Sequence, residues 1–193
     1  MVKFIGVERP IFAMNFGFVD IPVTLGYGYT TVGAEAQKTT EFGVIALNTF
    51  KVGTMGIEVL GGAYNAIIGN VIDGVNAWQH AYRLSGYQGA PCYGNAVTGN
   101  VSWGANHAYS FQKTAKYNAV MGFTAARTRG DAIEFTPVAH EIGSLESNVA
   151  ELNMISGTIE AGPKAVYLLG GRANIIDIVA ANQTKDAITV TKE

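Results

Sequence analysis

Three histidines are the first candidates for chemistry: His80, His107 and His140, the last followed by Glu141. Imidazole nitrogens bind zinc, but a metal site needs several ligands at one point, and residues 140–144 (HEIGS) lack the second histidine that would place two imidazoles on one helical face. A site that folding assembles from all three histidines stays open. A lone histidine is more often a hydrogen-bonded structural residue, so the sequence predicts no metal and no cofactor.

Cys92 is the single cysteine, and it excludes an intrachain disulfide and a multi-cysteine metal site. It could act as a nucleophile with His107 as its base. No helix amino terminus or neighbouring cation is evident that would lower the pKa of the thiol, so structural burial is the prediction.

Carboxylate pairs for glycoside hydrolysis could come from Glu134, Glu141 and Glu146, or from Asp73 and Glu58. Their separation in space cannot be obtained from sequence, and no supporting motif accompanies them. We interpret them as surface charges or local salt bridges. With no serine in a GxSxG motif, the chain is predicted not to be an enzyme.

A stretch of 29 residues from Leu84 to Gln112 contains no Asp, Glu, Lys or Arg, although it is rich in glycine, asparagine and aromatic residues. Charge-depleted aromatic surfaces form protein interfaces, and aromatic rings with amide side chains also bind sugars. The remaining interpretation is that these aromatics belong to the core of a β domain. The aromatic residues of the stretch are Tyr87, Tyr93, Trp103, Tyr109 and Phe111.

The overall charge excludes some partners. The chain has 13 basic and 15 acidic residues and a formal net charge of −2, so it lacks the basic surface of a nucleic-acid-binding protein. Glu8, Arg9 and Pro10 interrupt the amino terminus before a signal peptide could form. The apolar run 165–181 contains charges that a membrane span would exclude. We therefore expect a soluble chain that binds neither nucleic acid nor membrane.

The elements that must position these residues are mainly strands, because short runs of β-branched and aromatic residues recur between Gly, Asn and Thr. One or two short helices are predicted, and the places that could hold one are Asn76–Leu84 and Ser144–Met154. We find no internal repeat and predict one β-rich domain over residues 1–193, folded as a sandwich, jelly roll or barrel, with 84–112 as a charge-free loop or excursion. The strand candidates are Phe42–Leu47, Val52–Leu60, Tyr117–Thr124, Ala132–Thr136, Thr158–Glu160, Ala165–Leu169, Ile175–Val179 and Ala187–Thr191.

In its texture, a β-rich chain low in charge and rich in Gly, Thr, Ala and Asn, the whole sequence resembles the structural proteins of tailed-phage particles, and capsid cement or decoration proteins are the nearest type. The resemblance implies a non-enzymatic structural protein of the virion, assembled in the host cytoplasm. Outside a virion, the expected location is cytoplasmic. The chain would form a homo-oligomer, as a closed ring of three or more copies, and would attach to a shell or scaffold protein.

Two groups of residues are the candidates for the contact. The first is the aromatic set of the charge-free stretch, and the second is Phe12, Phe16 and Phe18 in an apolar amino-terminal arm. The alternative function is a carbohydrate-binding module, in which Trp103 and the neighbouring tyrosines stack on a glycan.

Overall fold

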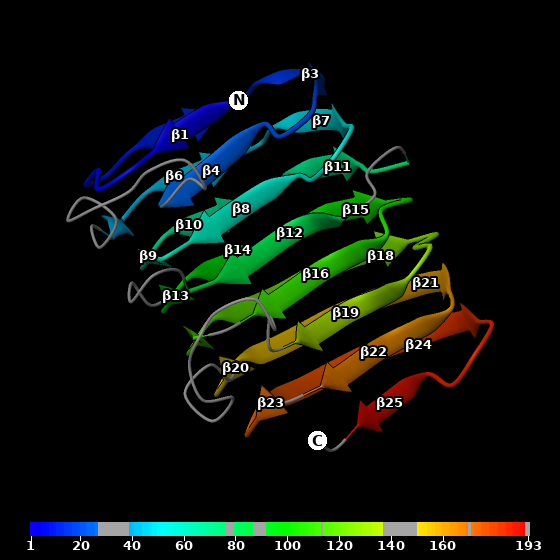
Figure 1. Cartoon of the computed structure of the whole chain (residues 1–193). Coiled ribbons are helices and arrows are strands. Elements are labelled where there is room, and N and C mark those ends of the chain that lie inside the picture. The colour runs from blue at the N-terminus through cyan, green and yellow to red at the C-terminus, as the bar shows by residue number, and fades with distance from the viewer. Residues whose placement is uncertain are drawn as a thin grey trace.

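The chain winds into a coil of parallel strands. The computed structural model describes residues 1–26, 39–75, 79–86, 92–112, 114–136, 150–169 and 171–191. Successive turns of the coil stack on one another, with the two termini at opposite ends of the stack (Figure 1). Every pairing between described strands is parallel. Each strand pairs with the equivalent strand of the turn before it or after it. The architecture is therefore a parallel β-solenoid.

Three sheets run along the solenoid. Sheet A has eight strands, in spatial order β1 (Val2–Phe4), β4 (Val23–Gly26), β8 (Ile57–Leu60), β12 (His80–Ser85), β16 (His107–Gln112), β19 (Asp131–Thr136), β22 (Lys164–Leu169) and β25 (Ile188–Thr191). Sheet B has six short strands: β5 (Thr40–Glu41), β9 (Gly62–Ala63), β13 (Cys92–Tyr93), β17 (Ala115–Lys116), β20 (Ala150–Glu151) and β23 (Gly171–Arg172).

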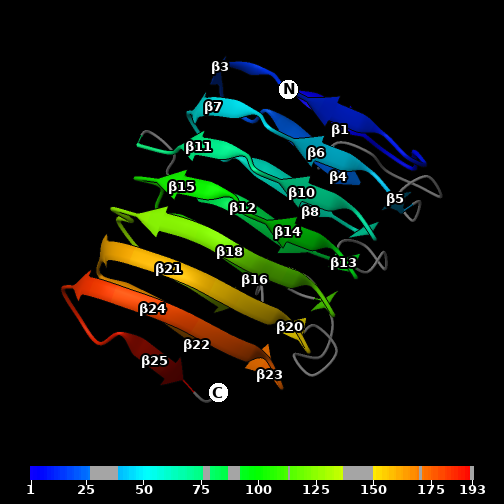
Figure 2. The ribbon, with the colours of Figure 1, turned by 180° about the vertical axis from the view of Figure 1, so that it is seen from behind.

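Sheet C is the largest, with eleven strands, and Figure 2 shows it from the front. In the first turns the chain crosses this sheet as two short strands separated by a bend, and later as one long strand. The short strands are β2 (Ile11–Ala13), β3 (Phe16–Val19), β6 (Val44–Ala46), β7 (Thr49–Val52), β10 (Ala66–Ile68), β11 (Val71–Asp73), β14 (Ala96–Thr98) and β15 (Val101–Trp103). The long strands are β18 (Ala119–Ala126), β21 (Met154–Gly162) and β24 (Ile175–Gln183).

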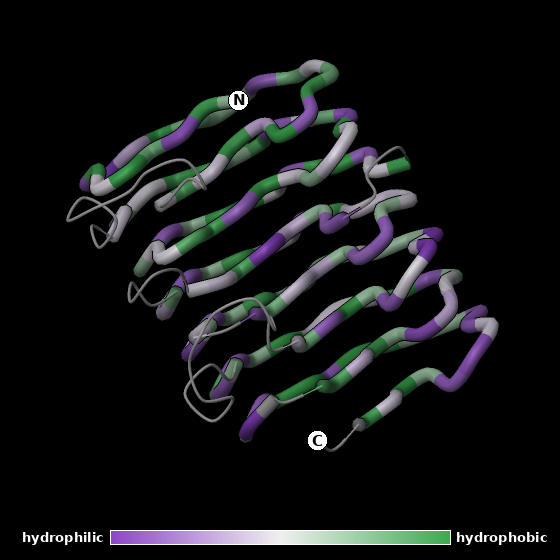
Figure 3. Tube along the Cα trace, viewed as in Figure 1, coloured by the Kyte–Doolittle hydropathy of each residue, from purple (hydrophilic) through white to green (hydrophobic). Residues whose placement is uncertain are grey.

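The prediction of a sandwich, jelly roll or barrel is wrong. Those folds are built mainly from antiparallel strands, whereas here all described strands pair in parallel between turns. Alternation of apolar and polar residues, which Figure 3 shows along the trace, is common to both architectures and does not distinguish them. The eight strands that the sequence predicts do overlap strands of the solenoid.

The two predicted helices and the central excursion are also wrong within the described residues. Residues 80–85 form β12, and 150–151 and 154 lie in β20 and β21; residues 76–78 and 144–149 lie outside the described part. The described residues of the stretch, 84–86 and 92–112, extend from the end of β12 through β13, β14 and β15 to β16, and so belong to the regular turns of the coil. In the part of the chain that the structure describes, no helix has the length and apolar character needed to cross a membrane.

Alternate side chains of each strand point into the solenoid and fill its interior. Tyr82 and Tyr109 stack in neighbouring turns with ring centroids 4.9 Å apart, and Phe111 and Phe135 stack at 4.8 Å. These side chains have at most 1 % of their surface exposed. The spacing matches the distance of about 4.8 Å between paired strands, so identical ring types stack because the register aligns them.

Two ladders of buried asparagines hold the bends of the coil. Each amide oxygen accepts hydrogen bonds from both the backbone N–H and the side-chain N–H of the preceding ladder member, as in Asn48 to Asn70 at 3.0 and 2.8 Å. Each side-chain nitrogen after Asn15 also donates to a backbone carbonyl of an earlier turn, as Asn70 does to Ile45, whereas Asn15 donates to Ala13 in its own turn. The first ladder is Asn15, Asn48, Asn70 and Asn100, and the second is Asn65, Asn95, Asn118, Asn153 and Asn174.

The residue before a ladder asparagine adopts a left-handed backbone conformation in every turn. Most are not glycine: Met14, Leu47, Tyr64 and Tyr117 have φ between 54° and 57°. A non-glycine residue in this region costs about 1 kcal/mol or more. The asparagine amide offsets this cost because it satisfies backbone N–H groups at the bend that neither flanking sheet can pair.

The first ladder ends at Asn100, because the equivalent position of the next turn holds a phenylalanine, Phe123. Thr124 pairs with Val101, which places Phe123 next to Asn100, and the register of β18 shifts between Val120 and Phe123. In the next turn the column is occupied by Gly157, where an added Cβ would lie 2.5 Å from the Phe123 ring. The change from asparagine to phenylalanine coincides with the change from two short strands to one long strand in sheet C.

The solenoid contains the internal repeat that the sequence reading missed. Successive ladder asparagines are 21 to 35 residues apart, so the repeat has no fixed period. The variation lies in the connection from sheet A to sheet B. This connection is one residue between β8 and β9, but thirteen residues between β4 and β5 and between β19 and β20.

Replacement of Asn70 by Ala should lower the free energy of unfolding by about 2–4 kcal/mol, because it leaves buried N–H groups of Asn48 without an acceptor. Asn15→Ala is the matched control. Asn15 donates to Asn48 but accepts from no other ladder member, so its loss should cost less than about 1 kcal/mol. Urea unfolding followed by circular dichroism measures both values, and equal losses would contradict the ladder's role.

Candidate functional site

The outer face of sheet C is called here the sheet C face, and among the described strands those of sheet C have the smallest share of charged residues. Its eleven strands contain four charged residues, Lys51, Asp73, Glu160 and Asp177. Lys51 and Asp73 are opposite each other in register, so their charges offset one another. Because charge depletion is typical of the centres of protein interfaces, this face is a candidate contact surface.

Large apolar side chains are exposed across the same face. Phe16 is 88 % exposed, and in the last turn Val179 is 69 % exposed. Both belong to one column of outward side chains, which runs through Thr49, Val71, Val101, Thr124 and Thr158. The exposed apolar residues of these strands and their bends are Ile11, Met14, Phe16, Phe18, Leu47, Ile68, Trp103, Met121, Met154, Ile175 and Val179.

The predicted contact residues separate into surface and interior. Phe16, Phe18 and Trp103 lie exposed on the sheet C face. Tyr93 is half-buried in sheet B, beside Tyr64. Tyr87 lies outside the described residues.

Three other predicted contact residues are directed into the solenoid. Tyr109 and Phe111 are fully buried, and Phe12 packs against the core with its ring stacked on Phe50. Tyr109 and Phe111 therefore present no surface to a partner. Their aromatic character reflects core packing, one of the interpretations that the sequence leaves open.

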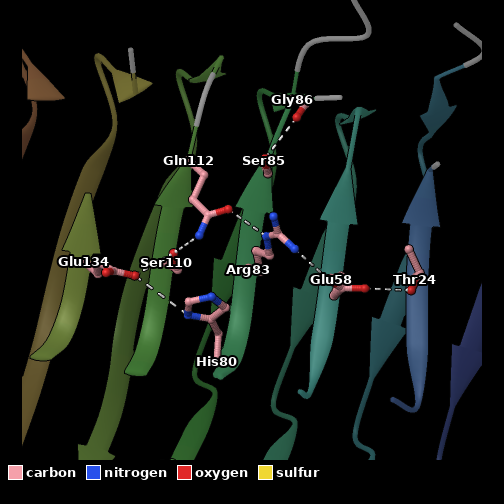
Figure 4. Close-up of polar contacts among 9 residues, drawn as sticks. All are labelled: Thr24, Glu58, His80, Arg83, Ser85, Gly86, Ser110, Gln112 and Glu134. Atoms are coloured by element: carbon pink, nitrogen blue, oxygen red, sulfur yellow. Dashed lines mark hydrogen bonds and ion pairs between the residues drawn. The ribbon is translucent and has the colours of Figure 1, made fainter. Parts of the chain in front are cut away.

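On the outer side of sheet A, buried polar side chains form a row across five strands (Figure 4). Thr24 Oγ1 donates to Glu58 Oε2 at 3.1 Å, and Glu58 Oε1 lies 3.3 Å from Arg83 Nη1. Arg83 Nε donates to Gln112 Oε1 at 2.9 Å. The row continues from Gln112 to Ser110 at 2.9 Å and from Ser110 to Glu134 at 3.2 Å.

Among the candidate carboxylates that the structure describes, none pairs with another as a glycosidase pair would. Glu58 and Glu134 share one row, but three strand spacings of about 4.8 Å place them roughly 14 Å apart, beyond the 6.5–9.5 Å of an inverting pair. Asp73 lies on the sheet C face and Glu58 on sheet A. Glu141 and Glu146 lie outside the described residues.

Cys92 is a structural residue. It is fully buried, and burial raises the pKa of its thiol to about 12. Asn95 of the second ladder lies with Nδ2 3.5 Å from the sulfur. A thiol with so high a pKa holds almost no thiolate at neutral pH, which removes it as a nucleophile.

The fold brings His80 and His107 together with Glu134. The sequence offers no reason to group this carboxylate with the histidines. His80 and His107 are in register on β12 and β16, and their ring centroids are 5.3 Å apart. His80 Nδ1 lies 3.9 Å from Glu134 Oε2. His140 lies outside the described residues. A signal was present, because His-Ala-Tyr occurs at both 80–82 and 107–109 and marks equivalent positions of two turns.

Neither a scan against protein-family models nor searches of curated proteins and of solved structures finds a match for this chain.

The pH dependence of stability should change in Glu58→Gln. Burial raises the pKa of Glu58, although the charge of Arg83, hydrogen bonds from Thr24 and Arg83, and the charge of Lys3 oppose the shift. A raised pKa means that this residue stabilises the fold at low pH and loses that contribution as pH rises through the folded-state pKa. The wild type should therefore lose more stability than Glu58→Gln as pH rises from about 4 to 7.

Urea unfolding at a series of pH values measures the difference between the two proteins. Glu151→Gln is the opposite control, because the hydrogen bond from Lys116 lowers the pKa of that half-buried carboxyl. The wild type should therefore lose more stability than Glu151→Gln as pH falls. Parallel curves for wild type and Glu58→Gln would contradict the assignment.

Proposed function

We propose that this protein is a non-enzymatic structural assembly subunit that associates with further copies of itself through the sheet C face. The observation that carries the proposal is the row of exposed apolar side chains on that face, headed by Phe16 and Phe18 at 88 % and 66 % exposure. Soluble monomers rarely expose large contiguous apolar surface, and such surface marks interaction sites.

The size of the face supports the same conclusion. A column on it crosses seven strands, which span about 29 Å, and β21 is nine residues long, which is about 30 Å. The product is close to 900 Å², and a standard interface buries about 800 Å² per partner. One face of the solenoid is therefore large enough for a specific contact with a second copy.

A closed symmetric oligomer would present several identical surfaces to a larger particle, and this multiplies weak contacts into a stable attachment. On this proposal the particle is a shell such as a phage capsid, and the subunit acts there as a cement or decoration protein. Its location is then the virion, after assembly in the host cytoplasm.

The double variant Phe16→Glu/Phe18→Glu should weaken self-association by at least about 30-fold, because it places two charges among apolar side chains of the contact. Tyr117→Glu is the matched control. It adds one glutamate, in place of two, at an aromatic residue that is 61 % exposed, on the bend between sheets B and C.

Mass photometry and analytical ultracentrifugation measure the oligomer, and circular dichroism checks that each variant folds. A wild-type chain that is monomeric at micromolar concentration would overturn the proposal. Equal weakening by the control would place the contact elsewhere.

A carbohydrate-binding module remains the second candidate, because Trp103 is 40 % exposed on the same face. The guanidinium of Arg127 lies 4.8 Å from the centre of the indole ring and occupies one of its faces. A sugar could stack on the other face. On a glycan array, a specific signal that Trp103→Ala abolishes would support this function, and absence of binding by the wild type would remove it.

A further inference from the structure

Three potential metal ligands converge at sheet A, from neighbouring strands in three consecutive turns. One nitrogen each of His80 and His107 and one carboxylate oxygen of Glu134 all lie within 4.8 Å of one another. Figure 4 shows His80 directed toward Glu134. His80 is 9 % exposed, and the other two residues are half-buried, so the cluster is sheltered but can be reached from solvent.

His80 has a buried ring nitrogen with no hydrogen-bond partner. This atom, Nδ1, is the one that faces Glu134 at 3.9 Å. Buried polar atoms without a partner are rare in folded proteins, and each needs an explanation such as a bound ion. Burial lowers the pKa of His80 well below its usual value, and the charges of His107 and Arg83 lower it further.

His107 and Glu134 are already oriented by neighbouring groups. Nδ1 of His107 lies 2.9 Å from the carbonyl oxygen of Asp131, and because a carbonyl can only accept, this nitrogen carries the proton. In the neutral form of the ring the lone pair is then on Nε2, which is the atom that would bind a ligand. Ser110 Oγ donates to Glu134 Oε2 at 3.2 Å. Contacts of this kind orient metal-binding histidines and carboxylates in proteins.

We propose that His80, His107 and Glu134 form a binding site for a divalent transition-metal ion, Zn²⁺ foremost, with one coordination position left open. Two imidazoles and one carboxylate favour zinc over magnesium or calcium, which prefer sets of oxygen ligands. Zinc bonds of about 2.0–2.1 Å in a tetrahedron place ligand atoms roughly 3.3 Å apart. The 3.9 Å between His80 Nδ1 and Glu134 Oε2 requires a contraction of about 0.6 Å, and a pair of ligand atoms at the 4.8 Å limit requires about 1.5 Å, which side-chain rotation can supply.

The ion would link β12, β16 and β19, and would therefore stabilise the solenoid as it binds. The charge of Arg83 does not prevent this, because Glu58 lies 3.3 Å from it on the side away from β16. Three protein ligands and an open position also let water or an exchangeable ligand complete the coordination. The site is on sheet A and does not depend on the proposed contact at sheet C.

The test uses the full chain without a polyhistidine tag, stripped of metal with a chelator. Isothermal titration should show one Zn²⁺ per chain with a dissociation constant in the micromolar range or below, and excess Zn²⁺ should raise the Tm by several degrees. Mg²⁺ at the same concentration should leave the Tm unchanged. Glu134→Gln, which still accepts from Ser110, should weaken Zn²⁺ binding at least tenfold and abolish the Tm shift.

Two further variants keep the test decisive. Glu160→Gln changes a carboxylate on the sheet C face and should bind Zn²⁺ as the wild type does. His80→Gln should lose binding as Glu134→Gln does, and it replaces that variant if the metal-free Tm shows that Glu134→Gln is unfolded. A wild type that takes up no Zn²⁺, or Zn²⁺ affinities equal to the wild type in both ligand variants, would overturn the proposal.

Discussion

The pairing of backbone N–H groups at the bends is the constraint on which the solenoid depends. At each bend the chain leaves one line of strands for the next, so the N–H there has no partner in either. A ladder asparagine supplies the acceptor, and its own N–H groups are satisfied by the next asparagine and by a carbonyl of an earlier turn. One side-chain type thus meets the hydrogen-bonding needs of the bend, and it also makes strained left-handed residues such as Leu47 and Tyr64 tolerable.

Because the ladders align every turn with the next, residues at equivalent positions form columns with a spacing of about 4.8 Å. The chemistry of a column depends on which side chains the successive turns place at that position. On sheet C the result is a broad apolar face, with Phe16 at one end of a column and Val179 at the other. On sheet A it is the stacked pair His80 and His107 next to Glu134. Both candidate sites therefore follow from register and not from any local motif.

Much of the local structure could be predicted from sequence, but the topology could not. Runs such as Ala132–Thr136 predict strands because β-branched and aromatic residues favour them, and β19 covers that run. A parallel solenoid and a sandwich show the same alternation of apolar and polar residues along their strands, so the pattern does not separate them. The repeat is hard to see in the sequence because the ladder asparagines are unevenly spaced. The helix over Asn76–Leu84 failed because the spacing of Trp78 and Tyr82 suits a helix face, while strand pairing directs Tyr82 into the solenoid. Glu134 joins the histidines only through strand register.

The polar row of sheet A gives that sheet a second means of fixing its register. Both faces of β8 and β12 are buried, so apolar patterning alone would distinguish the two faces poorly. A slip of one residue would turn Glu58 and Arg83 into the interior, where unpaired charges cannot be accommodated. The buried ion pair therefore specifies alignment more than it adds stability. With register fixed by asparagines at the bends and by charges on sheet A, the residues of sheet C need not specify alignment, and their outer face is free to be apolar.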